Sequence, residues 1–244
     1  MVTVFAAYLL GSVPTGFLAG KARGLDIRTV GSGNIGATNV FRTLGKAAGA
    51  AVLLVDAAKG FFACWLVVRI AFGVFGGGNS RVTLEALRVV AGVAAILGHN
   101  YTCWLGFKGG KGVATTAGVL LALFPLAFAI GLGVWLAVFA LGRIVSLASI
   151  AAAVALPVAV WVSGGSGTLI AVAGALGALA IFKHKANIQR LLNGTEHRFG
   201  RKKTEEASSE AGRSRGDAAQ TSRESEPPHV GCYGKRTNAE ETRK

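Results

Sequence analysis

Glycines and polar side chains alternate near the N-terminus, in a segment that reads GSGNIGATNVFRTLGK over residues 31–46. The glycines allow tight turns and let a ligand approach the backbone closely. Arg42 follows Thr38 by one helical turn, and its guanidinium can hold two oxygen atoms at once. Free N–H groups at the start of a helix also favour negative charge. The segment is therefore typical of an oxyanion site, to which Ser32 adds a hydroxyl group.

A second segment of this kind reads GHNYTCWLGFKGGKGVAT over residues 98–115. Lys108 and Lys111 are separated by two glycines and followed by a third, which indicates a flexible phosphate clamp at a helix start. Anchoring at a membrane surface would explain the lysines equally well, but not the glycines between them. His99 precedes the loop, and a hydrogen-bonded structural role is its simplest interpretation.

Two further segments carry hydroxyl, amide and imidazole groups. Ser146 and Ser149 share one face of a helix, although serines in membrane helices often only bond the carbonyl four residues earlier. His184 and Asn187 are spaced to share a face near the end of an apolar run, and Glu196 follows an Asn-Gly turn. Both segments fit a polar site next to a membrane.

The combined chemistry of these segments favours a phosphate-bearing ligand. Cations outnumber acids, and neither a carboxylate cluster for magnesium nor a ligand set for zinc is present, so we expect no metal and no cofactor. The first segment matches GxGxxG formally, with Asp56 twenty residues further on. A dinucleotide site is nevertheless excluded, because that fingerprint requires a strand before the glycines.

Asp56 and Lys59 are three residues apart within an apolar run, where they would form an ion pair in a helix. Each charge would cost roughly 2.5–3.5 kcal/mol at the centre of a bilayer. A purely structural pair and a pair that supports the site are both consistent with this cost.

The elements that must position these groups are membrane helices. The 244-residue chain is 52% hydrophobic and only 16% charged, with a mean hydropathy of +0.50, which excludes an ordinary soluble domain. Its net charge of +14 lies at the ends of apolar runs and not along one face, so we expect no nucleic-acid partner. The apolar runs cover residues 2–18, 47–75, 82–105, 113–141, 144–162 and 168–182.

The run at 113–141 would be about 43 Å long as one helix, which is too long for a bilayer. Pro125 near its middle predicts two short helices. With the N-terminus outside, seven spans place the C-terminus in the cytoplasm and leave only Arg81 in an outside loop. The basic residues on the inside are then Lys21, Arg23, Arg28, Arg42, Lys46, Lys108, Lys111, Arg143, Lys183, Lys185, Arg190 and Arg198.

The composition changes near residue 201. Residues 1–200 form the predicted membrane domain. Residues 201–244 are rich in charged and small polar residues and nearly lack large apolar ones, so we expect a disordered tail.

Four ordered motifs resemble those of the PlsY family of bacterial acyl-phosphate:glycerol-3-phosphate acyltransferases. They are GSVPTGFLAGKARGLDIRTVGSGNIGATNVFRTLGK, LGHNYTCWLGFKGGKGVAT, RIVSLASI and FKHKANIQRLLNGTE. The resemblance implies seven transmembrane helices in the bacterial inner membrane, with the active site facing the cytoplasm. It also implies acyl transfer from acyl phosphate to the 1-hydroxyl of glycerol 3-phosphate, giving lysophosphatidate and phosphate. Implied partners are these substrates, the lipid bilayer and the enzyme that makes acyl phosphate.

The resemblance also implies roles for particular residues. The glycerol 3-phosphate site would contain Ser32, Arg42, Lys108 or Lys111, His184 and Asn187. The pocket for the phosphate of the donor would contain Gly36, Ala37, Thr38, Ser146 or Ser149, and again Asn187.

The sequence lacks the histidine–aspartate pair, five residues apart, that soluble-domain glycerolipid acyltransferases use. The residues five positions after the four histidines are Trp104, Gln189, Lys202 and Gly234. Acyl phosphate already carries a good leaving group, so positioning and charge would suffice. A transporter of organic phosphates is the alternative, although such proteins usually place the site between repeated halves, and no repeat is visible.

Overall fold

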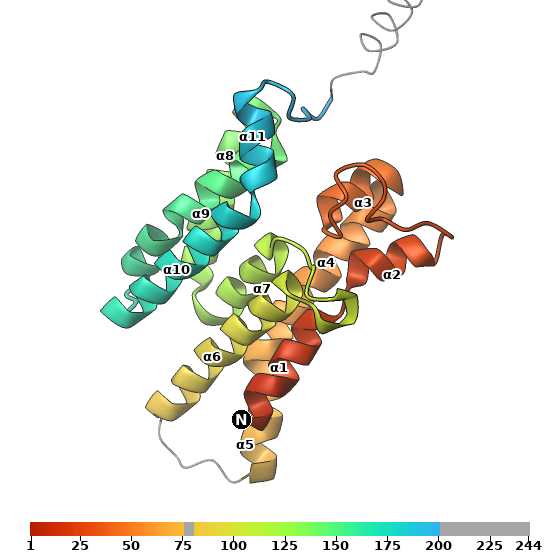
Figure 1. Cartoon of the computed structure of the whole chain (residues 1–244). Coiled ribbons are helices and arrows are strands. Elements are labelled where there is room, and N and C mark those ends of the chain that lie inside the picture. The colour runs from red at the N-terminus through yellow and green to blue at the C-terminus, as the bar shows by residue number, and fades with distance from the viewer. Residues whose placement is uncertain (76–80, 201–244) are drawn as a thin grey trace, which may run out of the picture. The chain divides into compact units, whose positions relative to one another are not determined.

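The computed structural model describes residues 1–75 and 81–200, and these residues form helices and loops, with no strand among them (Figure 1). Residues 1 to 199 pack as one unit. The helices are α1 (Val2–Ser12), α2 (Thr15–Lys21), α3 (Ala37–Thr43), α4 (Lys46–Phe62), α5 (Val68–Phe75), α6 (Arg81–Asn100), α7 (Val113–Leu123), α8 (Pro125–Gly142), α9 (Val145–Val162), α10 (Gly167–Lys183) and α11 (Lys185–Leu192). The predicted tail, 201–244, lies outside the described residues.

Short irregular turns join some of these helices. A π-helical turn, η1 (Ala63–Val67), connects α4 and α5, so that one long helical rod runs from residue 46 to residue 75. A 3-10 turn, η2 (Cys103–Leu105), follows α6 and opens the glycine-rich loop. The chain bends at Val13 and Pro14 between α1 and α2, as expected before a proline.

Close helix contacts hold the N-terminal part together. Helix α1 packs on α6, and α4 packs on α7. A methyl group added at Gly11 would lie 2.1 Å from the Ala95 carbonyl oxygen, and one at Gly118 would lie 1.8 Å from that of Ala57. Small residues let membrane helices approach backbone to backbone in this way. These contacts place the ends of α4, α6 and α7 beside one another.

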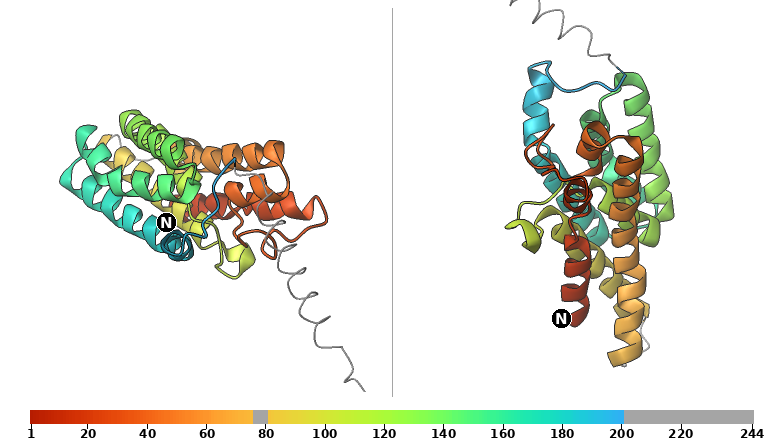
Figure 2. Two further views of the ribbon diagram at one scale, coloured as in Figure 1. Left: turned by 90° about the horizontal axis from the view of Figure 1, so that it is seen from above. Right: turned by 90° about the vertical axis from the view of Figure 1, so that its right-hand side faces the viewer.

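Helices α8, α9 and α10 form the second part of the unit, with α9 packed between the other two (Figures 1 and 2). A buried cluster of Ala127, Leu156, Ala159, Val160 and Ala173 joins them. Helix α8 begins at Pro125, directly after α7 ends at Leu123. The prediction of two helices within 113–141 is therefore confirmed. Proline at the first position of a helix needs no hydrogen-bond partner for its nitrogen, which explains why the new helix starts there.

Among the described residues, four helical stretches are long and apolar enough to cross a membrane: Val2–Lys21, Lys46–Ile70, Pro125–Gly142 and Val145–Val162. Helices α10 and α11, bent by 59° at His184, make a fifth if they count as one span. Helix α7 is apolar, but its 11 residues cover only about 16 Å. The prediction of an all-α membrane protein is confirmed.

Candidate active site

The glycine-rich loop folds back onto the end of α6. The Gly109 N–H donates to the Asn100 carbonyl at 3.2 Å, and the Gly110 N–H donates to the His99 carbonyl at 3.0 Å. These bonds fix the loop just before Gly112, whose φ of +78° starts α7. Lys111 consequently points towards α11, where its ammonium group donates to the side-chain oxygen of Asn187.

A buried carboxylate connects three of the four polar segments through Asn187. Glu196 is 8% exposed, and its Oε1 accepts from the Ser146 hydroxyl at 2.8 Å and the Asn187 amide at 2.7 Å. Its Oε2 accepts from Arg190 Nε at 2.6 Å. Both oxygen atoms are therefore satisfied, as a buried carboxylate requires. The bonds join the start of α9, helix α11 and the loop after it.

Burial and neighbouring charges shift the pKa values of this group. Burial raises the pKa of Glu196, but the bonds from Arg190, Asn187 and Ser146 outweigh it, so the pKa lies below its ordinary value. Burial lowers the pKa of Lys111 to about 8. Glu196 opposes that shift, whereas the positive charges of Arg190, Arg42 and Lys183 add to it. The site thus carries an excess of positive charge.

His184 lies at the bend between α10 and α11 and is buried. Its Nδ1 is 2.7 Å from the Ala180 carbonyl oxygen, and because a carbonyl can only accept, Nδ1 carries the proton. Burial and the nearby Lys111 charge lower the pKa of His184 to about 4. The ring is therefore neutral at pH 7, and its Nε2 is a hydrogen-bond acceptor.

Arg42, in the last turn of α3, supplies a further cation. Its Nε is buried and has no hydrogen-bond partner among the described residues. The guanidinium carbon lies 5.7 Å from the centre of the Phe199 ring, and Phe199 in turn packs edge-on against Phe139 of α8 at 5.9 Å. A buried guanidinium nitrogen without a partner indicates a place for an anionic ligand.

The loop before α3 is organised by Asn39, which is almost fully buried. Its amide group donates to the carbonyls of Ile27 and Val30, and its oxygen accepts from the Ser32 N–H at 2.8 Å. The Ser32 side chain stays exposed. Gly36, Ala37 and Thr38 form the first turn of α3.

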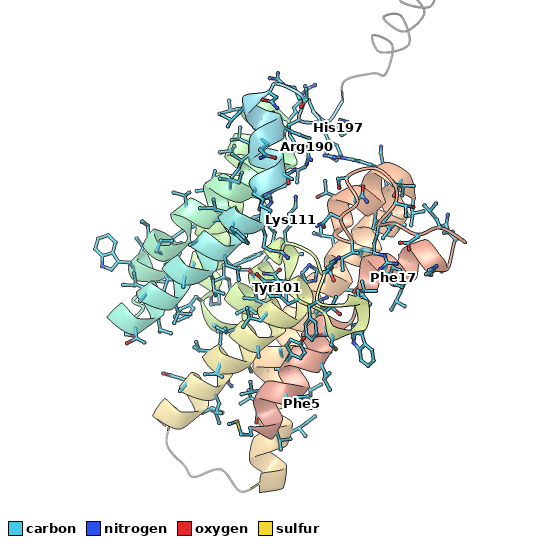
Figure 3. The ribbon with its side chains drawn as sticks, in the orientation of Figure 1. Phe5, Phe17, Tyr101, Lys111, Arg190 and His197 are labelled. Carbon is cyan, nitrogen blue, oxygen red and sulfur yellow. The ribbon has the colours of Figure 1, made fainter. Side chains whose placement is uncertain are left out.

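The structure brings several of the predicted residues together. Lys111 contacts Asn187, and Glu196 bridges Asn187 and Ser146. His184 and Arg42 lie close enough to Lys111 to interact with its charge. Figure 3 shows Lys111 beside α11, Arg190 on α11 itself, and His197 on the segment that follows. The structure places other predicted residues elsewhere. Lys108 is exposed, and Ser149 donates to the Val145 carbonyl and accepts from the Trp135 ring nitrogen. No described hydrogen bond joins the first turn of α3 to Lys111.

Three participants were not among the predicted site residues: Glu196, Arg190 and Phe199. The sequence pattern places Glu196 only after a turn and Arg190 only among the basic residues of the inside segments. Glu196 is the only acidic residue between Glu85 and Glu205, a stretch with eight basic residues from Arg88 to Arg198. This isolation is a signal that could have identified it, because a single carboxylate among so many hydrogen-bond donors is expected to accept from several of them. Nothing in the sequence marks Phe199.

The described residues contain no group of three or more histidine, cysteine, aspartate or glutamate side chains that could hold a metal ion. The donors gathered around Asn187 are instead cationic or neutral. The fold and this site define an integral membrane protein with a cation-rich polar site, suited to phosphate-bearing molecules.

Comparisons with known proteins identify the family. The family model for glycerol-3-phosphate acyltransferase matches residues 1–194. A glycerol-3-phosphate acyltransferase of Geotalea daltonii is 46% identical over 202 residues, covering 82% of this chain and 98% of that protein. The protein of that name from Aquifex aeolicus is 44% identical over 196 residues, with coverages of 80% and 97%. The chain belongs to the glycerol-3-phosphate acyltransferase family.

Solved structures agree with this assignment. The crystal structure of PlsY (YgiH), an integral membrane glycerol 3-phosphate acyltransferase, in its glycerol 3-phosphate form has a TM-score of 0.71 and 44% sequence identity. The match covers 81% of this chain and 94% of that one. The lysophosphatidic acid form gives a TM-score of 0.68 at 43% identity. The resemblance noted in the four sequence motifs is therefore confirmed at the level of the family and its membrane fold.

Proposed function

We propose that the protein transfers an acyl group from acyl phosphate to the 1-hydroxyl of glycerol 3-phosphate. The observation that carries this proposal is a cation-rich polar site in which Lys111, Asn187 and Arg190 gather around Glu196, in a chain that belongs to the glycerol-3-phosphate acyltransferase family. The hydroxyl oxygen attacks the acyl carbon, and the bond from that carbon to the phosphate oxygen breaks. Lysophosphatidate and inorganic phosphate leave. The family's activity and the lysophosphatidic acid form of the related structure support this reaction.

His99 and Asp56 form a histidine–carboxylate pair, but their position argues against a catalytic role. Both side chains are buried, at 5% and 2% exposed. A methyl group added to Gly110 would lie 2.0 Å from His99 Nε2, so the reactive end of the ring faces protein backbone. The pair has no room for a substrate hydroxyl. The leaving group must therefore make the reaction easy, which favours acyl phosphate over a thioester.

We assign Lys111 and Arg42 to the phosphate of glycerol 3-phosphate, because Lys111 contacts Asn187 and Arg42 is a half-buried cation close enough to Lys111 and Glu196 to interact with their charges. Ser146, with the first turn of α3 at Gly36–Thr38, would hold the phosphate of the donor. Ser32 would contribute through its exposed hydroxyl. The proton of the attacking hydroxyl passes to a substrate phosphate oxygen or to Nε2 of neutral His184. The acyl chain would lie in a groove between helices that is open to the lipid.

We propose seven spans, an outside N-terminus and an active site that faces the cytoplasm of a bacterial inner membrane. Met1 lies at the opposite end of the unit from α3 and α11 in both side views, which supports an odd number of crossings (Figures 1 and 2). The basic residues at the α3 and α11 end support a cytoplasmic location. Acyl phosphate is reactive, so the enzyme that makes it is a natural partner on the same side.

The donor can be tested with purified enzyme in excess chelator. Acyl phosphate and glycerol 3-phosphate should yield lysophosphatidate and one equivalent of inorganic phosphate. An acyl thioester, of coenzyme A or of acyl carrier protein, should give no comparable turnover as the only donor. Equal rates with a thioester would contradict the proposal. The same assay in sealed vesicles of both orientations tests the topology, since only vesicles with the cytoplasmic face outward should use added glycerol 3-phosphate.

Substrate binding should also depend on pH through Lys111. Its pKa of about 8 means that the free enzyme holds the ammonium form below pH 8 and loses it above. The KM for glycerol 3-phosphate should be flat up to about pH 7.5 and rise about tenfold by pH 9, as the charged fraction falls. In Lys111→Met the KM should be high at every pH. A wild-type KM that stays constant to pH 9.5 would remove Lys111 from this role.

A further inference from the structure

Three ionisable side chains are buried together next to the candidate active site, and no described hydrogen bond joins them to Asn187 or Glu196. Asp56 and Lys59 of α4 form an ion pair at 2.8 Å, and they are 2% and 4% exposed. His99, at the end of α6, places Nδ1 3.6 Å from the same Asp56 oxygen. That nitrogen has no hydrogen-bond partner among the described residues, and the Asp56 carboxylate beside it acts on the ring through its charge.

The ion pair also holds the bend between α1 and α2. Lys59 donates to the Val13 carbonyl at 2.9 Å, and the Thr15 hydroxyl donates to Asp56 at 3.0 Å. Val13 and Thr15 flank Pro14, where the chain turns towards the loop that carries Ser32. The buried charges thus contact the start of the first polar segment as well as the end of α6.

His99 supports the glycine-rich loop at two points. Its backbone carbonyl accepts from the Gly110 N–H, and its ring lies so close to Gly110 that no side chain would fit there. The next carbonyl, that of Asn100, accepts from Gly109 and also from the Lys183 ammonium group at 2.9 Å. Lys111 follows Gly110 directly. The contact between His99 and Gly110 therefore fixes the backbone directly before Lys111, and with it the direction of the Lys111 side chain.

Simple helix packing would not need these charges. Replacing a buried ion pair by apolar residues is often neutral or stabilising, so burial of the pair gains little stability by itself. We propose that Asp56, Lys59 and His99 are positioning residues, which hold the glycine-rich loop so that Lys111 meets the substrate phosphate. The proposal rests on the assignment of Lys111 to phosphate binding. None of the three touches the substrate.

Two variants disturb this cluster, one at the residue that contacts the loop and one at the carboxylate behind that residue. His99→Ala removes the ring beside Gly110 and leaves the ion pair intact. Asp56→Asn keeps the shape of the side chain but removes the charge beside the ring. If the unpaired lysine of that variant prevents folding, the double variant Asp56→Asn with Lys59→Gln is used in its place. Val68→Ala is the matched control, because Val68 is fully buried in the cluster formed by α1, η1, α5 and α6, away from the loop.

The two readouts are hydrogen exchange and steady-state kinetics. Exchange in peptides covering residues 106–112 should be at least tenfold faster in His99→Ala and Asp56→Asn, with α9 unchanged. The KM for glycerol 3-phosphate should rise about tenfold or more, since small displacements of a binding group are costly. Val68→Ala should reduce the yield of folded enzyme, and hence the maximal rate, without changing the KM or the exchange of the loop.

Folded His99→Ala enzyme with unchanged loop exchange would overturn the proposal. So would faster exchange with an unchanged KM, because the loop position would then not matter for binding. Failure of the proposed donor is separately visible, since it would appear in the wild-type enzyme. The exchange measurement requires no substrate at all.

Discussion

Replacing Glu196 with alanine should lower kcat/KM by about a hundredfold, equivalent to about 3 kcal/mol. The side chain is 8% exposed and accepts hydrogen bonds from Ser146, Asn187 and Arg190. Its loss leaves those donors unpaired in a region that already has excess positive charge. Because Arg190 remains 37% exposed, we place the effect at the lower end of the range for a broken buried pair. Asn187 would then no longer be held against Lys111.

Glu196→Gln separates charge from shape in this network. The amide oxygen can still accept from Ser146 and Asn187, but its NH2 group would face the Arg190 donor. We expect an intermediate loss of kcat/KM. Glu85→Gln, which neutralises an exposed carboxylate on α6, is the control and should behave like the wild type. A Glu196→Ala enzyme whose kcat/KM stays within threefold of wild type would show that the network does not support catalysis.

Arg42→Lys should weaken the use of glycerol 3-phosphate by about 1.5–3 kcal/mol, the range of a hydrogen bond to a charged group. A guanidinium can hold two phosphate oxygens at once, whereas lysine keeps the charge and loses that fork. The free Nε of Arg42 and the aromatic ring beside the guanidinium indicate an orientation already set for a ligand. Most of the loss should appear in the KM, and Arg42→Ala should be worse.

The alternative role for Arg42 is to anchor the following span on the cytoplasmic side, which lysine would do equally well. Arg23→Lys, at an exposed arginine in the loop after α2, is the matched control and should leave both kinetic constants unchanged. If correctly inserted Arg42→Lys enzyme has the wild-type dependence on glycerol 3-phosphate, Arg42 orients the helix and does not bind substrate.

The helices were largely predictable because their causes are local. Apolar runs of membrane length, the proline at position 125 and the charges between runs each act within a few residues. The pairing of Asp56 with Lys59 was predictable for the same reason, since three residues separate them on one helix. The family motifs then predicted the acyltransferase activity. Transport of organic phosphates has no support from the family that the chain matches.

The parts of the site that could not be predicted depend on contacts between distant segments. Nothing in the sequence distinguishes Lys111 from Lys108, because the choice depends on how the loop folds against α6. Ser146 and Ser149 share a helix face, yet only Ser146 meets Glu196, which lies 50 residues away in the chain. The approach of His99 to Asp56 is of the same kind, since it requires α4 and α6 to pack side by side.

The order of Glu196 and its partners along the sequence has a consequence for biosynthesis. Ser146, Asn187 and Arg190 all lie earlier in the sequence, so each leaves the ribosome before the carboxylate that connects them. A nascent chain that has inserted every helix up to α11 still lacks this connection. The hydrogen-bond network is completed only when translation has passed residue 196, so incomplete translation products in the membrane lack it.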